Sequence, residues 1–133
     1  MRIAVIPSHP NHLGNRLFSD ASTRDDILAS YRAVKRVVDL RGWSIRTFDL
    51  LPLEEADKVL AFGFNAFPEA ILAALDTVGR ENIVVVVREP PGIAPVYYDQ
   101  DIQRSFGAFC LPENTVPDNK NIFYFGFPIT PVS

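Results

Sequence analysis

The sequence contains one cysteine, Cys110, which excludes an intramolecular disulfide and a cysteine-rich metal site among these residues. It also lacks an excess of basic residues: the formal net charge is −3, and no basic patch typical of nucleic-acid binding is visible. No window reaches about 18 uninterrupted apolar residues, the minimum for a membrane span. The apolar run at 1–6 is too short for a signal peptide. We therefore expect a soluble, cytoplasmic protein with no nucleic-acid partner and no membrane span.

Glycine is scarce at the first candidate ligand-binding turn, PSHPNHLGNR at residues 7–16, which contains Gly14 alone. A dinucleotide-binding turn needs several glycines, because the backbone must approach the pyrophosphate closely. A nucleotide-binding, flavodoxin-like role is therefore disfavoured. A phosphoacceptor domain would carry acids at this place, whereas the sequence has Pro7 and Ser8.

What the sequence does contain is a regular alternation of apolar runs and helical patterns. Its 133 residues, 47% hydrophobic and 22% charged, indicate a single globular domain spanning 1–133. Strands are expected at 2–6, 44–50, 59–64, 83–87, 108–111 and 122–127, and helices at 23–41, 68–78 and 99–106, with one helical turn at 53–56. This order predicts an α/β, doubly wound (Rossmann/flavodoxin-like) three-layer domain with a mostly parallel five- or six-stranded sheet.

The first long helix carries the strongest local signals. Thr23 and Asp26 fit a capping box, and Gly42 is well placed to end the helix. An apolar stripe at helical spacing is expected to face the core. It comprises Ile27, Leu28, Tyr31, Val34, Val37 and Val38. The strand at 44–50 alternates in a way that is typical of a sheet edge.

Ligands of doubly wound domains bind beyond the carboxyl ends of the strands. His9 and His12 lie three residues apart in the loop that follows the first strand. A metal site is conceivable there. No third ligand is spaced to complete it, so we expect hydrogen bonding within the loop or an exposed binding role, and no metal.

Glu89 follows the most apolar strand and directly precedes Pro90 and Pro91. Pro90 favours an extended conformation of Glu89, and neither proline can donate to the sheet, so the chain leaves it here. A partly desolvated carboxylate at a strand end has a raised pKa and can serve as a general base. The alternative is that Glu89 forms a structural ion pair with Arg88. The residues alone do not decide between a catalytic base and an ion pair.

Three segments together resemble glycosyltransferase family 10, the α-1,3-fucosyltransferases and their bacterial relatives. The segment STRDDILASYRAVKRVVDLRGWSIRTFD at 22–49 matches the family's Arg-Asp helix start, glycine helix end and strand ending Thr-x-Asp. ADKVLAFGF at 56–64 resembles its Asp followed by an apolar strand. REPPGIAPVYY at 88–98 resembles its strand-end Glu followed by prolines.

The resemblance implies the amino-terminal, acceptor-binding domain of a fucosyltransferase-like inverting glycosyltransferase, with Glu89 as the catalytic base. The candidate contacts to a carbohydrate acceptor are His9, Asn11, His12, Arg24, Tyr97 and Tyr98. No cofactor is expected in this chain. A GDP-fucose-type sugar nucleotide would bind a donor domain that these 133 residues lack, on a further domain or subunit. The family often has an aspartate and Thr-Trp around the fifth strand, where this sequence reads FGAFCLP at 106–112.

An alternative hypothesis is a non-enzymatic, doubly wound module that binds a small molecule or pairs with another subunit. The surface near the strand ends discriminates between these two roles. A large apolar patch there favours a partner, and a polar, closed face favours an autonomous binder.

Overall fold

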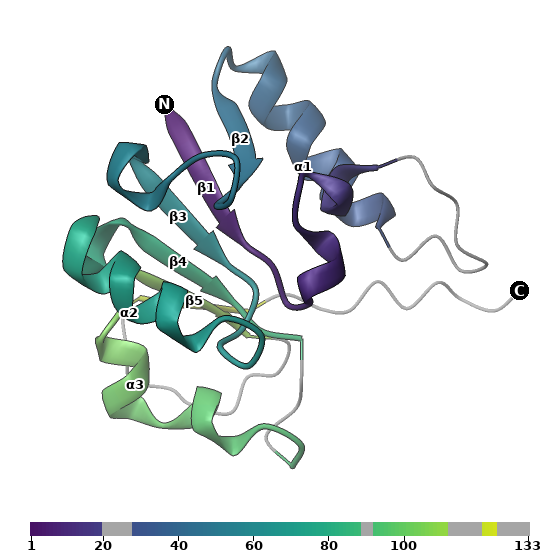
Figure 1. Ribbon diagram of the computed structural model, residues 1–133. Coiled ribbons are helices and arrows are strands. Elements are labelled where there is room, and N and C mark those ends of the chain that lie inside the picture. Colours follow the sequence, from purple (N-terminus) through teal and green to yellow (C-terminus); the bar gives the residue numbers. More distant parts are fainter. Residues whose placement is uncertain (20–27, 89–91, 112–120, 125–133) are drawn as a thin grey trace, which may run out of the picture.

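The computed structural model describes residues 1–19, 28–88, 92–111 and 121–124, and side chains for all of these except 122–124. These residues form a sheet with helices on both faces (Figure 1). Among the described residues, no helix is both long enough and apolar enough to cross a membrane.

The sheet has six strands in the order β2-β1-β3-β4-β5-β6, and every neighbouring pair is parallel. This confirms the predicted doubly wound α/β fold. The strands are β1 (Arg2–Ile6), β2 (Ser44–Thr47), β3 (Lys58–Ala61), β4 (Ile83–Val86), β5 (Ala108–Leu111) and β6 (Ile122–Tyr124). β2 is at an edge of the sheet, as its sequence pattern predicted.

One face of the sheet packs against α1 (Ala29–Leu40), and the other packs against α2 (Pro68–Thr77) and α3 (Gln100–Arg104). Pro68 is in the first turn of α2, where its missing N–H costs nothing. Short 3₁₀ turns connect these elements: η1 (Pro10–His12), η2 (Arg16–Phe18), η3 (Leu53–Glu55), η4 (Arg80–Asn82) and η5 (Pro95–Tyr98).

The two faces of the sheet are buried to different extents. In β3, β4 and β5, fully buried residues alternate with partly buried ones. The fully buried set, which includes Val59, Val85 and Phe109, faces α2 and α3 within the larger core cluster. The partly buried set, which includes Leu60 and Val86, faces the α1 side. The described part of α1 therefore covers its side of the sheet incompletely.

The apolar stripe of α1 is buried only in part. Leu28, Tyr31 and Val38 are buried, as predicted, whereas Val34 and Val37 are 40% and 55% exposed. The prediction that these two valines face the core is therefore wrong. On that side of the sheet the described residues place α1 and the 3₁₀ turn η2, whose Leu17 and Phe18 join the smaller core cluster, and neither element covers these two valines.

The end of α1 follows the prediction closely. Gly42 has φ = +73°, the left-handed conformation that ends many helices, and its N–H donates to the Asp39 carbonyl. The predicted capping box at Thr23 and Asp26, the apolar Ile27 and the start of the predicted helix lie outside the described residues.

Two side chains near the end of β2 fix the loop that follows β1. The Asn15 and Thr47 residues exchange hydrogen bonds: the Asn15 N–H donates to Thr47 Oγ1 and the Thr47 N–H donates to Asn15 Oδ1, both at 2.9 Å. Asp49 Oδ2 accepts from the Gly14 N–H at 2.9 Å. The loop between η1 and η2 is thereby held against the sheet.

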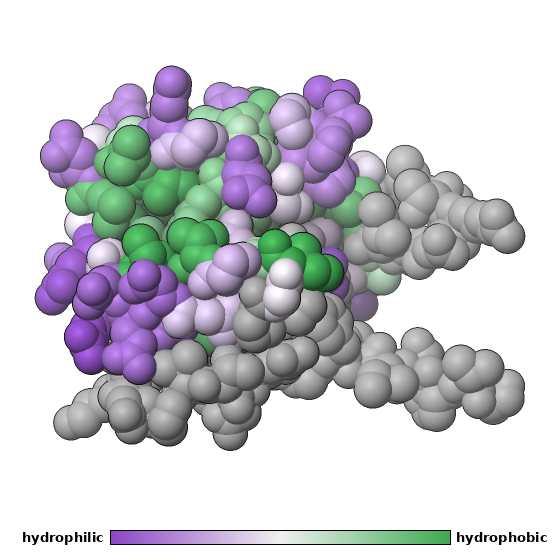
Figure 2. Space-filling model, turned by 90° about the horizontal axis from the view of Figure 1, so that it is seen from below, coloured by the Kyte–Doolittle hydropathy of each residue, from purple (hydrophilic) through white to green (hydrophobic). Residues whose placement is uncertain are grey.

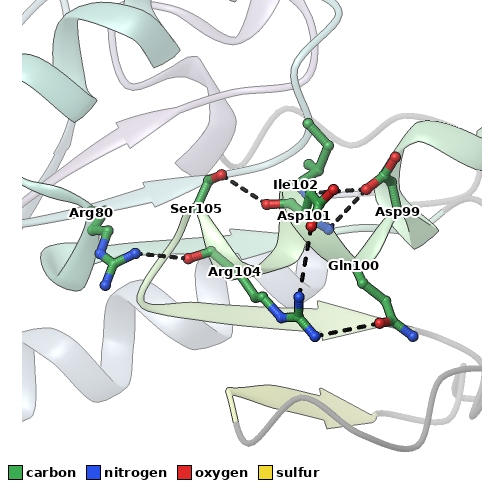
Figure 3. A network of polar contacts seen from close by, with 7 residues as sticks. All are labelled: Arg80, Asp99, Gln100, Asp101, Ile102, Arg104 and Ser105. Atoms are coloured by element: carbon green, nitrogen blue, oxygen red, sulfur yellow. Dashed lines mark hydrogen bonds and ion pairs between the residues drawn. The ribbon is translucent and has the colours of Figure 1, made fainter.

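A network of polar contacts stabilises the two ends of α3 (Figure 3). Asp99 Oδ1 caps the helix by accepting from the Asp101 N–H at 2.8 Å, and Ser105 Oγ donates to the Asp101 carbonyl. Arg80 Nη1 donates to the Arg104 carbonyl at 3.2 Å. Because Arg80 precedes β4 and Arg104 precedes β5, this link lies at the amino ends of those strands. The link between Arg80 and Arg104 is thus distant from the carboxyl ends, where ligands are expected.

Figure 2 shows hydrophobic residues in a band between hydrophilic margins on the face of the molecule seen from below. Exposed hydrophobic residues that are scattered singly are common on protein surfaces, whereas a contiguous apolar patch marks a binding or interaction surface. In the described residues the exposed large hydrophobic residues are Met1, Val34, Val37, Leu40, Leu50, Leu72, Ile93 and Val96.

Candidate functional site

The strand order reverses at β1, because β2 lies on one side of it and β3 on the other. The chain leaves β1 toward α1 and leaves β3 toward α2, which packs on the opposite face. Crevices at such switch points, beyond the carboxyl ends of the strands, are where doubly wound domains bind ligands. The carboxyl ends of β1, β3 and β4 are therefore the first place to look for a site.

A groove of about 410 Å³ lies over the face of β3, β4 and β5, between α1 and the incompletely covered side of the sheet, and it extends to Phe62 and Arg88 just beyond the carboxyl ends of β3 and β4. We call it the α1 groove. It is lined by Ser30, Tyr31, Val34, Leu60, Phe62, Val84, Val86, Arg88 and Cys110. A smaller hollow of about 40 Å³ adjoins it, reaches Ser8 at the end of β1, and shares the lining residues Tyr31, Phe62, Val86 and Arg88.

Arg88 and Tyr31 form the polar end of the α1 groove. The Arg88 side chain is exposed, its Cζ lies 5.5 Å from the centre of the Tyr31 ring, and its Nη1 lies 3.4 Å from the Tyr31 hydroxyl, to which it donates. A guanidinium over an aromatic face is held by a cation–π attraction. No described lining residue is acidic, so within this groove the Arg88 charge has only neutral partners.

The predicted histidines lie next to this polar end. The ring of His12 is 6.5 Å from that of Tyr31 and 5.8 Å from that of His9, between centroids, and the Tyr31 ring in turn contacts Phe62 edge-on at 4.9 Å. Burial, and secondarily the charge of His9, lowers the pKa of His12. This shift favours the neutral form of His12, whose buried Nδ1 has no hydrogen-bond partner among the described residues.

His9 and Asn11 show the loop hydrogen bonding that the sequence left as one alternative. His9 Nδ1 accepts from the Asn11 N–H at 3.1 Å and so caps η1. Both side chains are exposed. In the described residues, no group of three or more His, Cys, Asp or Glu side chains is arranged to hold a metal ion.

Tyr97 and Tyr98 lie on the other face of the sheet. Tyr97 is 2% exposed, belongs to the larger core cluster, and accepts a hydrogen bond from the Phe64 N–H at 2.8 Å. Its ring therefore lacks the exposed face that stacking on a sugar requires. Tyr98 is partly buried and packs against the same cluster. The structure thus does not bring these two tyrosines together with His9, Asn11 and His12.

Two of the predicted site residues, Arg24 and Glu89, lie outside the described residues. The predicted role of Glu89 as a base and that of Arg24 as an acceptor contact stay predictions. Arg88, the described residue directly before Glu89, lies at the carboxyl end of β4 beside the α1 groove.

Sequence reasoning missed Tyr31, Phe62 and Val86 as lining residues. Tyr31 was assigned to the core by its helical spacing, which is correct for its ring but overlooks its hydroxyl. Phe62 and Val86 belong to apolar runs that the sequence assigned to strands, without indicating which of their side chains line a groove. They line the groove because the described residues leave the α1 side of the sheet incompletely covered, which no local sequence pattern indicates.

The described residues also line two cavities away from this site. One of about 520 Å³ is lined by residues of the β2 exit, η3 and the start of α2, with Glu69 as its only charged lining residue. The other, of about 380 Å³, lies on the outer side of α1 among Arg32, Lys35, Arg36 and Asp39. There Lys35 already pairs with Asp39 at 2.7 Å. In the described residues, neither of these cavities combines mostly apolar walls with a cationic side chain and no acidic one, as the α1 groove does with Arg88.

Comparison with known proteins adds no assignment: no protein-family model matches the chain, and neither a curated protein nor a solved structure gives a significant match.

Proposed function

We propose that this domain binds a small-molecule ligand in the α1 groove, as a doubly wound binding module. The observation that carries the proposal is the groove itself, which lies over the face of β3, β4 and β5 and extends to Arg88 beyond the carboxyl end of β4, while the adjoining hollow reaches Ser8 after β1. Its volume falls within the roughly 300–1,000 Å³ of typical ligand sites, which are mostly apolar with a few polar groups. Arg88 and Tyr31 are polar groups of that kind.

The test uses Cys110, the only cysteine of the chain, which lines the groove and so reports on its occupancy. A diverse panel of small molecules is screened for compounds that slow alkylation of Cys110 and raise the melting temperature. A Val86→Phe variant, which adds bulk on the groove side, is expected to weaken such binding. Val96→Phe is the matched control, because Val96 is exposed on η5. The proposal is refuted if Val86→Phe and Val96→Phe bind the identified ligand with equal affinity. It is also refuted if no compound of the panel protects Cys110 from alkylation.

A second candidate is the acceptor-binding domain of a fucosyltransferase-like inverting glycosyltransferase. The position of Arg88 favours it, because the residue that follows Arg88 in the sequence is Glu89, the base that the family resemblance implies. In this mechanism Glu89 takes the proton of an acceptor hydroxyl, whose oxygen attacks the anomeric carbon as the nucleotide leaves. The sugar nucleotide would be supplied by a further domain or subunit.

Calorimetric titration with fucosylatable oligosaccharides tests this candidate. Binding is expected to weaken in a His12→Ala variant, because His12 lies beside the groove. It is expected to be unchanged in Glu54→Gln, since Glu54 is exposed on η3. If no acceptor binds at millimolar concentration while another compound does protect Cys110, the glycosyltransferase candidate fails and the binding module stands.

A further inference from the structure

We propose that the ligand of the α1 groove is an amphipathic carboxylate, bound with its carboxylate on Arg88 and its hydrocarbon part along Leu60, Val84 and Val86. This inference rests on the proposed function, since it names the ligand class of the same groove. It is carried by three features of the described residues: an apolar floor, an unmatched cation and the distance between them.

The floor of the groove is an apolar sheet face that the helices of the described residues cover incompletely. Leu60 on β3, Val84 and Val86 on β4, and Cys110 on β5 all point to this side and are only partly buried. Covering each of these side chains with an apolar ligand would contribute about 25 cal/mol of favourable free energy per Å² of apolar surface removed from water. Val34, 40% exposed on α1, forms the opposite wall. A hydrocarbon group is the ligand chemistry that these walls favour.

The cation fixes which end of the ligand is polar. Arg88 lies at the end of the groove, and no described lining residue carries a negative charge. The Tyr31 ring and hydroxyl hold the guanidinium in place without neutralising it. A guanidinium presents paired N–H donors whose geometry matches a carboxylate. The charge complementarity of the groove therefore calls for an anion at this end.

A carboxylate fits better than a phosphate at this position. Arg88 is the only cationic side chain that lines the groove in the described residues. The nearby His12 adds little second charge at pH 7, because its lowered pKa favours the neutral form. A phosphate monoester carries up to two negative charges and usually recruits several cations or backbone donors. One guanidinium balances one carboxylate.

The length of the floor sets the size of the hydrocarbon part. Val84 and Arg88 are four residues apart along an extended segment, which corresponds to about 13 Å at 3.3 Å per residue. The extended chain of decanoate is of similar length, so decanoate is a suitable probe. Decanoate is used below its critical micelle concentration, so that the measurement reports the binding of monomeric decanoate and not of micelles.

The experiment compares decanoate with decanol, and Arg88→Gln with the matched control Arg46→Gln. Arg46 is exposed on β2, outside the groove. Decanoate is expected to slow Cys110 alkylation and to bind by calorimetry. Arg88→Gln should weaken it about tenfold or more, the size of one hydrogen-bonded charge pair, and Arg46→Gln should leave it unchanged. Decanol should bind about tenfold more weakly than decanoate, with no dependence on Arg88.

Three results would overturn the inference: decanoate that does not protect Cys110, equal decanoate affinity in the two arginine variants, or a concentration-dependent dimer that protects Cys110 without ligand. In the last case the groove is an interface between copies of the chain. If decanoate fails but another compound of the panel protects Cys110 in a way that Val86→Phe abolishes, the ligand class is wrong and the proposed function stands. If no compound protects Cys110, both fail.

Discussion

The phenolic oxygen of Tyr97 lies 2.8 Å from the backbone nitrogen of Phe64, 33 residues earlier in the sequence, and accepts its hydrogen bond. This contact joins η5 to the chain that leaves β3, so it positions the segment just beyond the carboxyl end of that strand. The Tyr97 ring lies 4.9 Å from the ring of Phe64, between centroids, within the larger core cluster.

We expect Tyr97→Phe to lower the free energy of unfolding by about 1–3 kcal/mol, because the Phe64 N–H is left without its acceptor in a partly buried place. Urea denaturation measures the loss. Tyr31→Phe is the matched control and should cost less, since Tyr31 gives up only a 3.4 Å contact with an exposed guanidinium. Equal losses in the two variants would show that the Tyr97 hydrogen bond contributes nothing particular.

Gly63 is required beside the same tyrosine. Its φ is +84°, and an added Cβ would lie 2.8 Å from the Tyr97 hydroxyl oxygen. Gly63→Ala is expected to lower the free energy of unfolding by at least about 1–2 kcal/mol from the left-handed backbone alone. Gly92→Ala, where the added Cβ meets nothing within 4 Å, should leave stability nearly unchanged.

The two sites should also be coupled. Removal of the Tyr97 hydroxyl opens the space that the new Cβ needs, so the double variant Gly63→Ala/Tyr97→Phe should lose less than the sum of the single losses. Additive losses in a double-mutant cycle would contradict the clash.

The sequence was sufficient to predict the strands and the layered fold, because its apolar runs are short and end at proline, glycine or polar residues. Pro7 follows β1, and Gly42 ends α1 as expected. It was not sufficient to predict which apolar residues are covered. Val34 and Val37 have the same spacing as the buried Val38, and only the arrangement of helices over the sheet leaves them exposed.

The residues that line the candidate groove were not predictable from the sequence. The rule that ligands bind at the carboxyl ends of strands located the loop of His9 and His12. The contact between Arg88 and Tyr31 joins residues 57 apart in the sequence, and no local pattern indicates it. Tyr97 illustrates the opposite error: a tyrosine next to prolines was interpreted as a binding residue, whereas tertiary packing buries its ring.

His12 predicts a loss of stability in mild acid. Burial and the charge of His9 lower its pKa from the ordinary value near 6.5, so the unfolded chain takes up a proton at a higher pH than the folded protein does. The stabilising contribution is thus fully present above about pH 6.5 and is lost as the pH falls toward the lowered pKa. Urea denaturation between about pH 8 and pH 5 measures it.

A His12→Phe variant should show a flatter pH profile than the unmodified protein. His9→Asn keeps a side-chain acceptor for the cap of η1 and removes only the secondary cause, so it should flatten the profile less. A His12→Phe profile as steep as that of the unmodified protein would assign the acid sensitivity to other groups.

Cys110 predicts a slow, pH-dependent thiol. Burial raises its pKa, and because the thiolate is the reactive form, alkylation at pH 8 should be slower than that of a free cysteine in an unfolded peptide. The rate should rise with pH along a curve displaced to higher pH than that of the peptide.

Because the chain has one cysteine, Cys110→Ser supplies a blank without any reaction. Val86→Phe, which narrows the groove in front of the thiol, should slow the reaction further and displace the curve to still higher pH, since it removes more water from the thiolate. A Cys110 that reacts as fast as the peptide at every pH would mean that this side of the sheet is open to water, and the α1 groove would then be too exposed to hold a ligand.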